Sequence, residues 1–292
     1  MSKTLLLPKK LIVASGAMGM TGMGWIPLQR IYYWMVAMIP VLKSVTYLPN
    51  KGNPPWKALR MLWGMESCVN AMALGNKGLL HLLLVILPRL RHDVIVSLHA
   101  KSPAEMAMMV RLVRKYHKLH PEWFRHVLAF EINLSCPNVA EAIDFLGILR
   151  VARFLPRPVI AKIAADERQI KAVACAARQG YIQAVSAINT VRWERIFGNK
   201  PSPLERWLGV KGAVSGSKIQ KIARETITTL RSVLPKGFPI IGGGGIMRYR
   251  DLYRFRRAGA TYFSLGSVLT QHLFLTLFLF LWIRIWGLPD TD

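Results

Sequence analysis

Short apolar runs recur along most of the chain and alternate with longer segments of helical period. The runs are too short for buried helices, and several end in glycine, serine or asparagine, as buried parallel strands do when they open into loops. Strands that alternate with helices in this way predict a single-domain (β/α)8 TIM barrel of the α/β class. The eight expected strands cover residues 11–14, 43–47, 94–98, 130–136, 158–163, 184–188, 239–246 and 260–265. The expected helices include residues 104–116, 140–154, 218–230 and 251–258.

The last part of the chain has a different pattern, so we divide the sequence into a barrel over residues 1–268 and a hydrophobic tail over residues 269–292. Residues 273–283 are apolar apart from Thr276. This run is shorter than the ~20 residues that span a bilayer. It is also apolar on every side, whereas the outer helix of a barrel normally has one polar face. Two interpretations therefore stay open: a last barrel helix packed on the core, or a contact with a partner or a membrane surface.

The most informative stretch is 130–138, where an apolar lead-in turns into a polar cluster. Pro137 cannot extend a sheet, so Cys136 is expected where the strand ends. In a parallel barrel that end carries the chemistry. Asn133 and Asn138 can orient a planar polar ligand, and a thiol can give or take a proton. An isolated cysteine can equally be a buried structural thiol.

Two further features point to a ligand. Lys162 lies inside the apolar run 158–163, and an unpaired buried ammonium is costly, so its side chain should face a polar or acidic group. Glycines close the seventh and eighth strands, at 242–245 and at Gly266, and a helical segment follows each of them. Backbone N–H groups at such ends form a phosphate cradle, which barrels commonly place after these two strands.

The segment Asn-x-Ser-Cys-Pro-Asn at 133–138 resembles the signature of dihydroorotate dehydrogenases, the flavin enzymes of pyrimidine synthesis, in the branches that use cysteine as base. The resemblance extends over most of residues 11–265, and Gly-Asn-Pro-Pro at 52–55 is similar to the NAD-linked branch. The chain departs from the family at Ala73, which replaces a glycine, and at Ser97, which replaces an asparagine. It also departs at Ala213, and the loop after Asn138 is shorter than in the family.

The resemblance implies FMN bound across the mouth of the barrel and oxidation of dihydroorotate to orotate in de novo pyrimidine and UMP biosynthesis. Cys136 would take the C5 proton as general base while the C6 hydride goes to flavin N5. Lys43 and Lys162 would supply positive charge to the reaction. The implied substrate-binding residues are Lys43, Asn70, Asn133, Asn138, Asn189 and Thr190. The implied cofactor-binding residues are Ala14, Ser15, Gly16, Lys43, Ser44, Asn133, Lys162, Gly216, Gly244, Gly245, Gly266 and Ser267.

Composition adds constraints on compartment and partners. The 292 residues include only three cysteines, which is too few for an iron–sulfur cluster of their own and gives no disulfide framework. Residues 1–10 lack the apolar core of a secretory signal. We therefore expect a cytoplasmic protein and no metal site. A net charge of +25 favours contact with polyanions. Because the basic residues are dispersed, specific nucleic-acid binding is not expected, whereas a peripheral contact with the inner face of a membrane stays open.

The electron acceptor and the function class each leave alternatives. The resemblance argues against the quinone-using branch, which carries serine as base, and the 52–55 segment then favours NAD-linked over fumarate-linked chemistry. The NAD-linked branch implies a partner subunit carrying FAD and an iron–sulfur cluster, in a heterotetramer; a homodimer is the other expected assembly. One rival function is a tRNA-dihydrouridine synthase, another FMN barrel, which would explain the charge. The other is a non-catalytic barrel attached to a membrane or a partner.

Overall fold

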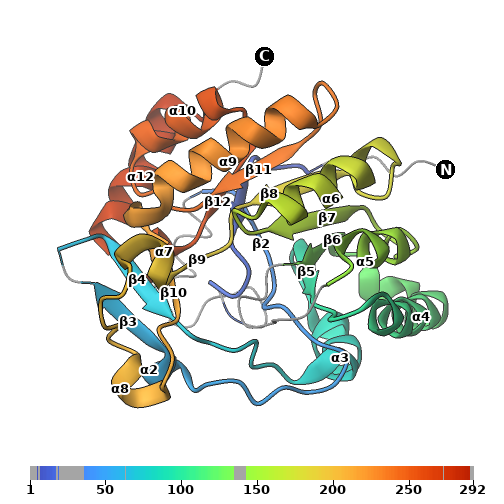
Figure 1. Cartoon of the computed structure of the whole chain (residues 1–292). Helices are drawn as coiled ribbons and strands as arrows, with labels where there is room; N and C mark the ends of the chain where they lie inside the picture. The colour runs from blue at the N-terminus through green and yellow to red at the C-terminus, as the bar shows by residue number, and fades with distance from the viewer. Residues whose placement is uncertain are drawn as a thin grey trace.

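The computed structural model describes residues 5, 7–17, 19, 36–62, 64–134, 143–271 and 273–289. Eight parallel strands form one sheet in the order β2-β1-β12-β11-β8-β7-β6-β5, and parallel bridges from Val41 to Ile95 and from Val45 to Leu98 join its two ends. The sheet is thus a nearly closed barrel with helices on its outside (Figure 1), and the predicted (β/α)8 fold is confirmed. Its strands are β1 (Leu11–Val13), β2 (Met38–Pro40), β5 (Val94–Leu98), β6 (Val127–Asn133), β7 (Val159–Ile163), β8 (Ala184–Ala187), β11 (Ile240–Gly243) and β12 (Tyr262–Leu265).

Helices cover the barrel, and three of them begin at a polar side chain that caps their first turn. Ser102, Asp144 and Asp166 each accept a hydrogen bond from a backbone N–H three residues later. These caps satisfy N–H groups that have no partner within the helix. The main helices are α4 (Pro103–Leu119), α5 (Phe145–Ala152), α6 (Glu167–Arg178), α9 (Gln220–Val233), α10 (Tyr249–Ala258) and α12 (Leu273–Trp286). Shorter helical segments are α2 (Pro55–Ala58), α3 (Gly78–His81), η1 (Leu82–Ile86), η2 (Leu87–Arg89), η3 (Pro121–Phe124), α7 (Trp193–Phe197), α8 (Glu205–Leu208), η4 (Ser217–Ile219) and α11 (Ser267–Gln271).

One expected barrel strand was placed wrongly. We predicted 43–47 from its β-branched residues, but the second strand is β2, and the later segment joins the sheet by a single β-bridge, from Val45 to Leu98. Buried Thr46 instead donates to the Leu48 carbonyl and bonds to Asn76. Residues 43–47 are therefore a buried connection that brings Lys43 and Ser44 to the end of the barrel.

A second sheet, which the sequence did not predict, stands beside the barrel (Figure 1). It is antiparallel, with the strand order β3 (Leu59–Leu62), β4 (Ser67–Asn70), β10 (Ala213–Gly216) and β9 (Val191–Arg192). Within this sheet, Ala213 of β10 pairs with Asn70 of β4. An ion pair between Glu66 and Arg248 links the β3–β4 turn to the start of α10.

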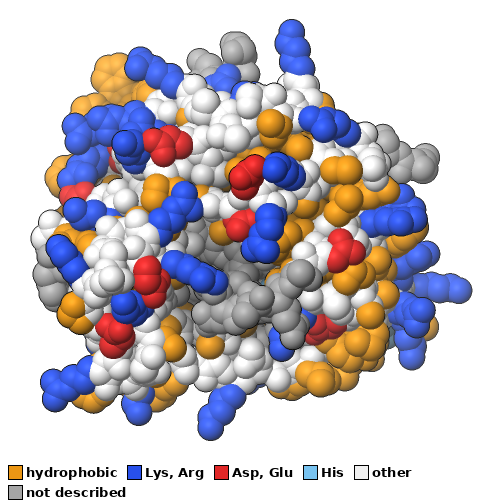
Figure 2. Space-filling view, in the orientation of Figure 1, with side chains coloured by type: hydrophobic (Ala, Val, Ile, Leu, Met, Phe, Trp, Pro, Cys, Tyr) orange, Lys and Arg blue, Asp and Glu red, His pale blue; other side chains and the backbone are white. Residues whose placement is uncertain are grey.

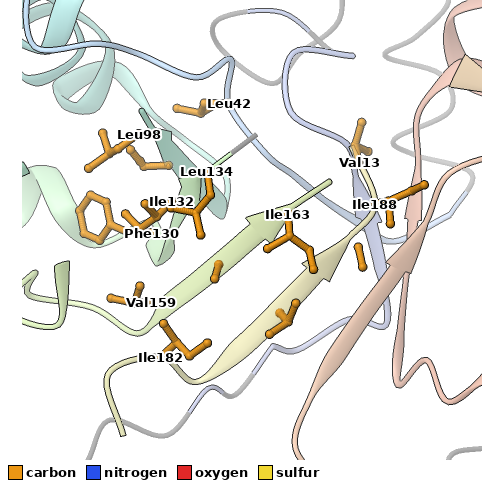
Figure 3. Close-up of a cluster of buried hydrophobic side chains, with 14 of the residues drawn as sticks. Val13, Leu42, Leu98, Phe130, Ile132, Leu134, Val159, Ile163, Ile182 and Ile188 are labelled. Atoms are coloured by element: carbon orange, nitrogen blue, oxygen red, sulfur yellow. The ribbon is translucent and has the colours of Figure 1, made fainter. Parts of the chain in front are cut away.

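The inside of the barrel has two layers of side chains: an apolar layer, and a polar layer nearer the carboxyl ends of the strands. Successive side chains of a strand point to opposite faces, so alternate residues face the barrel axis. The lower layer is an apolar cluster that includes Ile95, Ala129, Ile160, Ala184 and Ile241. Two positions further along the same strands stand Ser97, Glu131, Lys162, Ser186 and Gly243. The residues between them, such as Phe130, Ile132, Val159 and Ile163, belong to the larger core cluster shown in Figure 3. Strand alternation therefore directs polar groups to the carboxyl end of the barrel.

The last helices are α11 and α12, and α12 packs on α11 and on α10. Thr276, Leu279, Phe280 and Ile283 are its buried residues. Within the described part of the chain, the helices are all too short or too polar to cross a membrane.

Candidate active site

A cavity of about 1040 Å³ opens at the carboxyl ends of the barrel strands, and we call it the barrel mouth. Its volume is at the upper end of the range of roughly 300–1,000 Å³ for ligand pockets. The site residues predicted from the sequence line it wherever the structure describes them. They are Ala14, Ser15, Gly16, Lys43, Ser44, Asn70, Asn133, Lys162, Asn189, Thr190, Gly216, Gly244, Gly245, Gly266 and Ser267. Cys136 and Asn138 lie outside the described residues.

Lys162 has the acidic neighbour that its place in an apolar strand required. Its Nζ lies 3.8 Å from Oε1 of Glu131, and both side chains are almost entirely buried. Oε1 of Glu131 also accepts a hydrogen bond of 2.8 Å from Ser97 Oγ. Glu131 thus has two partners, which offset part of the cost of burying a carboxylate.

Glu131 was not among the site residues predicted from the sequence, although a signal was present. It stands two residues before Asn133 on the same strand, so alternation puts both side chains inside the barrel. The register pairs Asn133 with Lys162 on the neighbouring strand, which brings the carboxylate within reach of the ammonium. Only the pairing of β6 with β7 reveals this contact.

A chain of hydroxyl groups continues from Glu131 toward the cavity. Ser97 Oγ and Ser44 Oγ are 2.8 Å apart, and Ser44 Oγ is 3.2 Å from Ser15 Oγ. Ser97 is fully buried and does not line the cavity. The serine that replaces the family's asparagine therefore supports the site from behind, through Ser44.

Two amide side chains meet in the cavity from strands that are far apart in sequence. Asn133 Nδ2 donates to Ser44 Oγ at 3.2 Å, and Asn189 Nδ2 donates to Asn133 Oδ1 at 3.4 Å. The backbone N–H of Thr190 donates to Asn189 Oδ1 at 2.9 Å. Asn70 reaches the cavity from β4 and donates to the Ala213 carbonyl at 3.5 Å. This set offers donors and acceptors for the edge of a planar heterocycle.

Lys43 makes this part of the cavity electropositive. Burial lowers the pKa of Lys43, and the positive charge of Lys162 lowers it further. Acidic side chains line the cavity only at the more exposed Glu194 and Glu205 among the described residues. A bound anion would favour the charged form of Lys43, so the inner cavity is suited to an anionic ligand.

Glycines form the opposite part of the wall, where backbones approach closely. Gly216, Gly244 and Gly245 have φ values of +95°, +102° and +100°, which disfavour other residues. A Cβ on Gly245 would come within 2.6 Å of the Gly216 carbonyl oxygen, and one on Gly216 within 2.4 Å of the Glu66 carbonyl oxygen. This part of the wall is therefore mainly backbone, and it suits a phosphate group better than a side-chain-lined wall would. Together with the lysines, it fits an anionic cofactor such as FMN.

Further polar residues of the cavity were not predicted. Ser215 Oγ lies 3.0 Å from Cys68 Sγ and accepts a hydrogen bond of 2.9 Å from Ser267 Oγ. Ser186 also lines the cavity, from the polar layer of the barrel. Cys68 and Ser215 face each other across the second sheet, so no local pattern could have identified them.

The departure at Ala73 has a structural consequence. Its φ is 48°, in the left-handed region where glycine is favoured, and Leu74 next to it has a φ of 54°. A residue with a Cβ in this conformation costs roughly 1–2 kcal/mol. The methyl group is therefore a penalty in a loop that lines the cavity.

Fold and cavity together define a barrel enzyme, with its polar groups gathered at the carboxyl ends of the strands. The chain belongs to the dihydroorotate dehydrogenase family, whose sequence model matches residues 3–276. Curated relatives named dihydroorotate dehydrogenase B (NAD+), catalytic subunit, include one from Desulforudis audaxviator, 34% identical over 78% of this chain and 73% of that protein. Another, from Pyrococcus horikoshii, is 32% identical over 88% of this chain and 81% of that protein. A third, from Phocaeicola vulgatus, is 26% identical over 78% of this chain and 74% of that protein.

These matches confirm the predicted family and, with it, the prediction of an oxidoreductase. They favour it over a tRNA-dihydrouridine synthase and over a barrel without catalytic activity. The described residues include no cluster of side chains able to hold a metal ion.

Proposed function

We propose that the protein oxidises dihydroorotate to orotate with FMN bound in the barrel mouth. The observation that carries the proposal is the convergence of Lys43, Lys162, Asn133 and Asn189 on one cavity with a glycine wall. Dihydroorotate is a heterocycle with amide groups in its ring and a carboxylate. Its binding therefore requires hydrogen-bond partners for the amide groups and positive charge for the carboxylate. Membership of the dihydroorotate dehydrogenase family supports the same substrate.

The reaction removes a proton from C5 and a hydride from C6, and a C5=C6 double bond forms. FMN, when bound, supplies the hydride acceptor. We propose that Gly216, Gly244, Gly245, Gly266 and Ser267 hold its phosphate, and that Ala14, Ser15, Gly16 and Ser44 contact the rest of it. Lys162 would stabilise negative charge near the flavin pyrimidine, with its ammonium oriented by Glu131.

The substrate would be held by its amide and carboxylate edges. Asn70, Asn133, Asn138, Asn189 and Thr190 are the proposed partners, together with Lys43. Cys136 is the proposed general base for the C5 proton. A positioned base raises the rate of such a proton transfer roughly 10²–10⁴-fold. Positive charge close to a cysteine favours its thiolate, which is the form that accepts the proton.

We further propose that the electrons leave through a separate subunit. The relatives are named as catalytic subunits of an NAD+ enzyme, which implies a second subunit. A partner carrying FAD and an iron–sulfur cluster would accept electrons from this chain, in a heterotetramer; a homodimer of this chain is the alternative. A reducing compartment such as the cytoplasm is the proposed location, because three scattered cysteines give no disulfide framework.

An anaerobic titration of the purified protein with dihydroorotate, followed in the flavin absorption band, tests the function. We expect a yellow protein whose band bleaches with one equivalent of substrate per flavin. Cys136→Ala should keep the flavin and slow bleaching by roughly 10²–10⁴-fold, the contribution of a positioned base.

Cys175→Ala provides the matched control, because Cys175 lies on the outer helix α6 and does not line the cavity. It should leave the rate unchanged. Full-speed bleaching in Cys136→Ala would remove Cys136 as the base, and a flavin band that dihydroorotate does not bleach would overturn the proposed reaction.

A further inference from the structure

Helix α12 has two apolar faces, and only one of them is buried. Thr276, Leu279, Phe280 and Ile283 pack against the rest of the protein. On the opposite side a second apolar stripe faces outward. Its successive residues are one, three or four positions apart in the sequence, which places them on one side of a helix. This exposed stripe consists of Phe274, Phe278, Leu281, Trp282, Ile285 and Trp286, which are 45–74% exposed.

Tyrosines of α10 extend the stripe into an aromatic row. The rings of Trp282 and Trp286 are 6.2 Å apart, and Tyr249 stacks near Trp282 at 6.3 Å. Tyr253 meets Tyr249 edge-on at 5.5 Å, and the Tyr249 hydroxyl donates to the Gly287 carbonyl. Tryptophan and tyrosine are enriched where one end of a side chain meets lipid and the other meets water. We call the exposed stripe and these two tyrosines the outer face.

Arginines flank the outer face, and no exposed acidic side chain offsets them between residues 249 and 287. The only acidic residue there is Asp251, which is buried and accepts hydrogen bonds from the backbone N–H groups of Met247 and Arg248. Figure 2 shows Lys and Arg side chains gathered beside hydrophobic ones at the edge where Figure 1 places α10 and α12. The exposed arginines are Arg250, Arg254, Arg257 and Arg284.

This positive charge distinguishes between two possible binding partners of the outer face, a second copy of the chain and an anionic lipid surface. A second copy of the chain would bring the same arginines against themselves in a two-fold interface, between partners that each carry +25. An anionic lipid surface complements both the aromatic row and the arginines. The helix of 14 residues is about 21 Å long, so it can lie in the interface but not span a bilayer.

We propose that the outer face docks the protein on an anionic membrane surface, with α12 lying in the plane of the headgroups. The aromatic side chains enter the boundary between headgroups and acyl chains, and the arginines bind lipid phosphates. Each basic residue near such a surface is worth roughly a fivefold change in binding.

The test is co-sedimentation of the full-length protein with vesicles of phosphatidylglycerol and phosphatidylcholine, compared with vesicles of phosphatidylcholine alone. We expect binding to the anionic vesicles that is at least about tenfold stronger, and that weakens with added salt. Vesicles with brominated acyl chains should quench the tryptophan fluorescence of the unmodified protein. Equal binding to both vesicles, or no binding, would overturn the proposal.

Two variant pairs locate the contact. Phe278→Ser with Trp282→Ser should abolish quenching and binding, whereas Trp56→Ser with Trp207→Ser removes exposed aromatic residues elsewhere and should not. Replacing Arg250, Arg257 and Arg284 by Gln should weaken binding on the order of 100-fold. Replacing Arg111, Arg114 and Lys118 by Gln removes the same charge from α4, on another side of the barrel (Figure 1), and should have less than a tenth of that effect.

If a variant of the outer face and its control lose equal amounts of vesicle binding, the loss is a general effect of charge or hydrophobicity. That result would overturn the assignment. Sedimentation velocity without vesicles gives the remaining outcome. Self-association that disappears in the Phe278→Ser, Trp282→Ser variant, in a protein that does not bind vesicles, would assign the outer face to a second copy instead.

Discussion

The barrel mouth and the outer face of α12 each reverse the usual distribution of side chains. At the mouth, polar groups such as Glu131 and Lys162 are buried. On the outer face, large apolar groups such as Phe274 and Trp286 are exposed. Both arrangements cost free energy, and a folded chain retains such costs mainly where it binds something.

The two regions differ in how the cost is offset. At the mouth, the buried charges and hydroxyls are partners of one another, through Glu131, Ser97 and Ser44. The region is therefore largely organised before any ligand arrives, as a catalytic site should be. On the outer face, aromatic stacking orders the side chains but leaves them in water. Its stabilisation has to come from outside the chain.

The sharpest test of this contrast compares two phenylalanines on the same helix. Phe280 is fully buried, so Phe280→Ala should lower the free energy of unfolding by roughly 3–5 kcal/mol. Phe278 is 59% exposed, so Phe278→Ala should change it by less than about 0.5 kcal/mol. Urea denaturation of both variants measures the difference. Similar losses in the two variants would mean that the outer face is part of the core.

The next test removes the charge at the centre of the mouth. Lys162→Met should slow flavin reduction by dihydroorotate roughly 10²–10³-fold, the cost of removing one preorganised electrostatic partner. It leaves the Glu131 carboxylate buried with Ser97 as a remaining partner. Stopped-flow absorbance under anaerobic conditions gives the rate.

Lys171→Met serves as the control for Lys162→Met, because Lys171 is an exposed lysine of α6 whose ion pair with Glu167 lies in solvent. Its rate should equal that of the unmodified protein. Unchanged reduction in Lys162→Met, at normal flavin content, would contradict the role of Lys162.

The smallest expected effect concerns the second lysine of the mouth. Folding lowers the pKa of Lys43, mainly through burial and then through Lys162, so the unfolded chain binds more protons between that lowered pKa and the ordinary value of 10.5. The free energy of unfolding of the ligand-free protein should therefore rise with pH across this window, and the full penalty is present below it. Lys43→Met should remove the penalty and stabilise the ligand-free protein by roughly 0.5–2 kcal/mol at neutral pH.

The measurement is the difference between the two proteins in urea denaturation at neutral and alkaline pH. Taking the difference cancels the other groups that titrate. The gain in free energy of unfolding from Lys43→Met should shrink as pH rises through the window. A gain that stays constant would show that the charge of Lys43 does not destabilise the protein.

The amino-acid sequence by itself determined the barrel and the residue types at its mouth. Strand and helix periods, and the glycines and amides that end the strands, are local patterns, so they can be read without knowing which strand is next to which. For that reason seven of the eight strands were expected near their observed positions, and only β2 was misplaced.

Only the tertiary structure decided the contacts between segments far apart in the chain. The antiparallel sheet pairs Asn70 with Ala213, and the register of β6 with β7 sets Glu131 beside Lys162. Packing likewise separated the buried and exposed faces of α12, which the sequence had left as one apolar run. These features depend on which surfaces meet, and that is fixed by the free energy of the whole fold rather than by any local pattern.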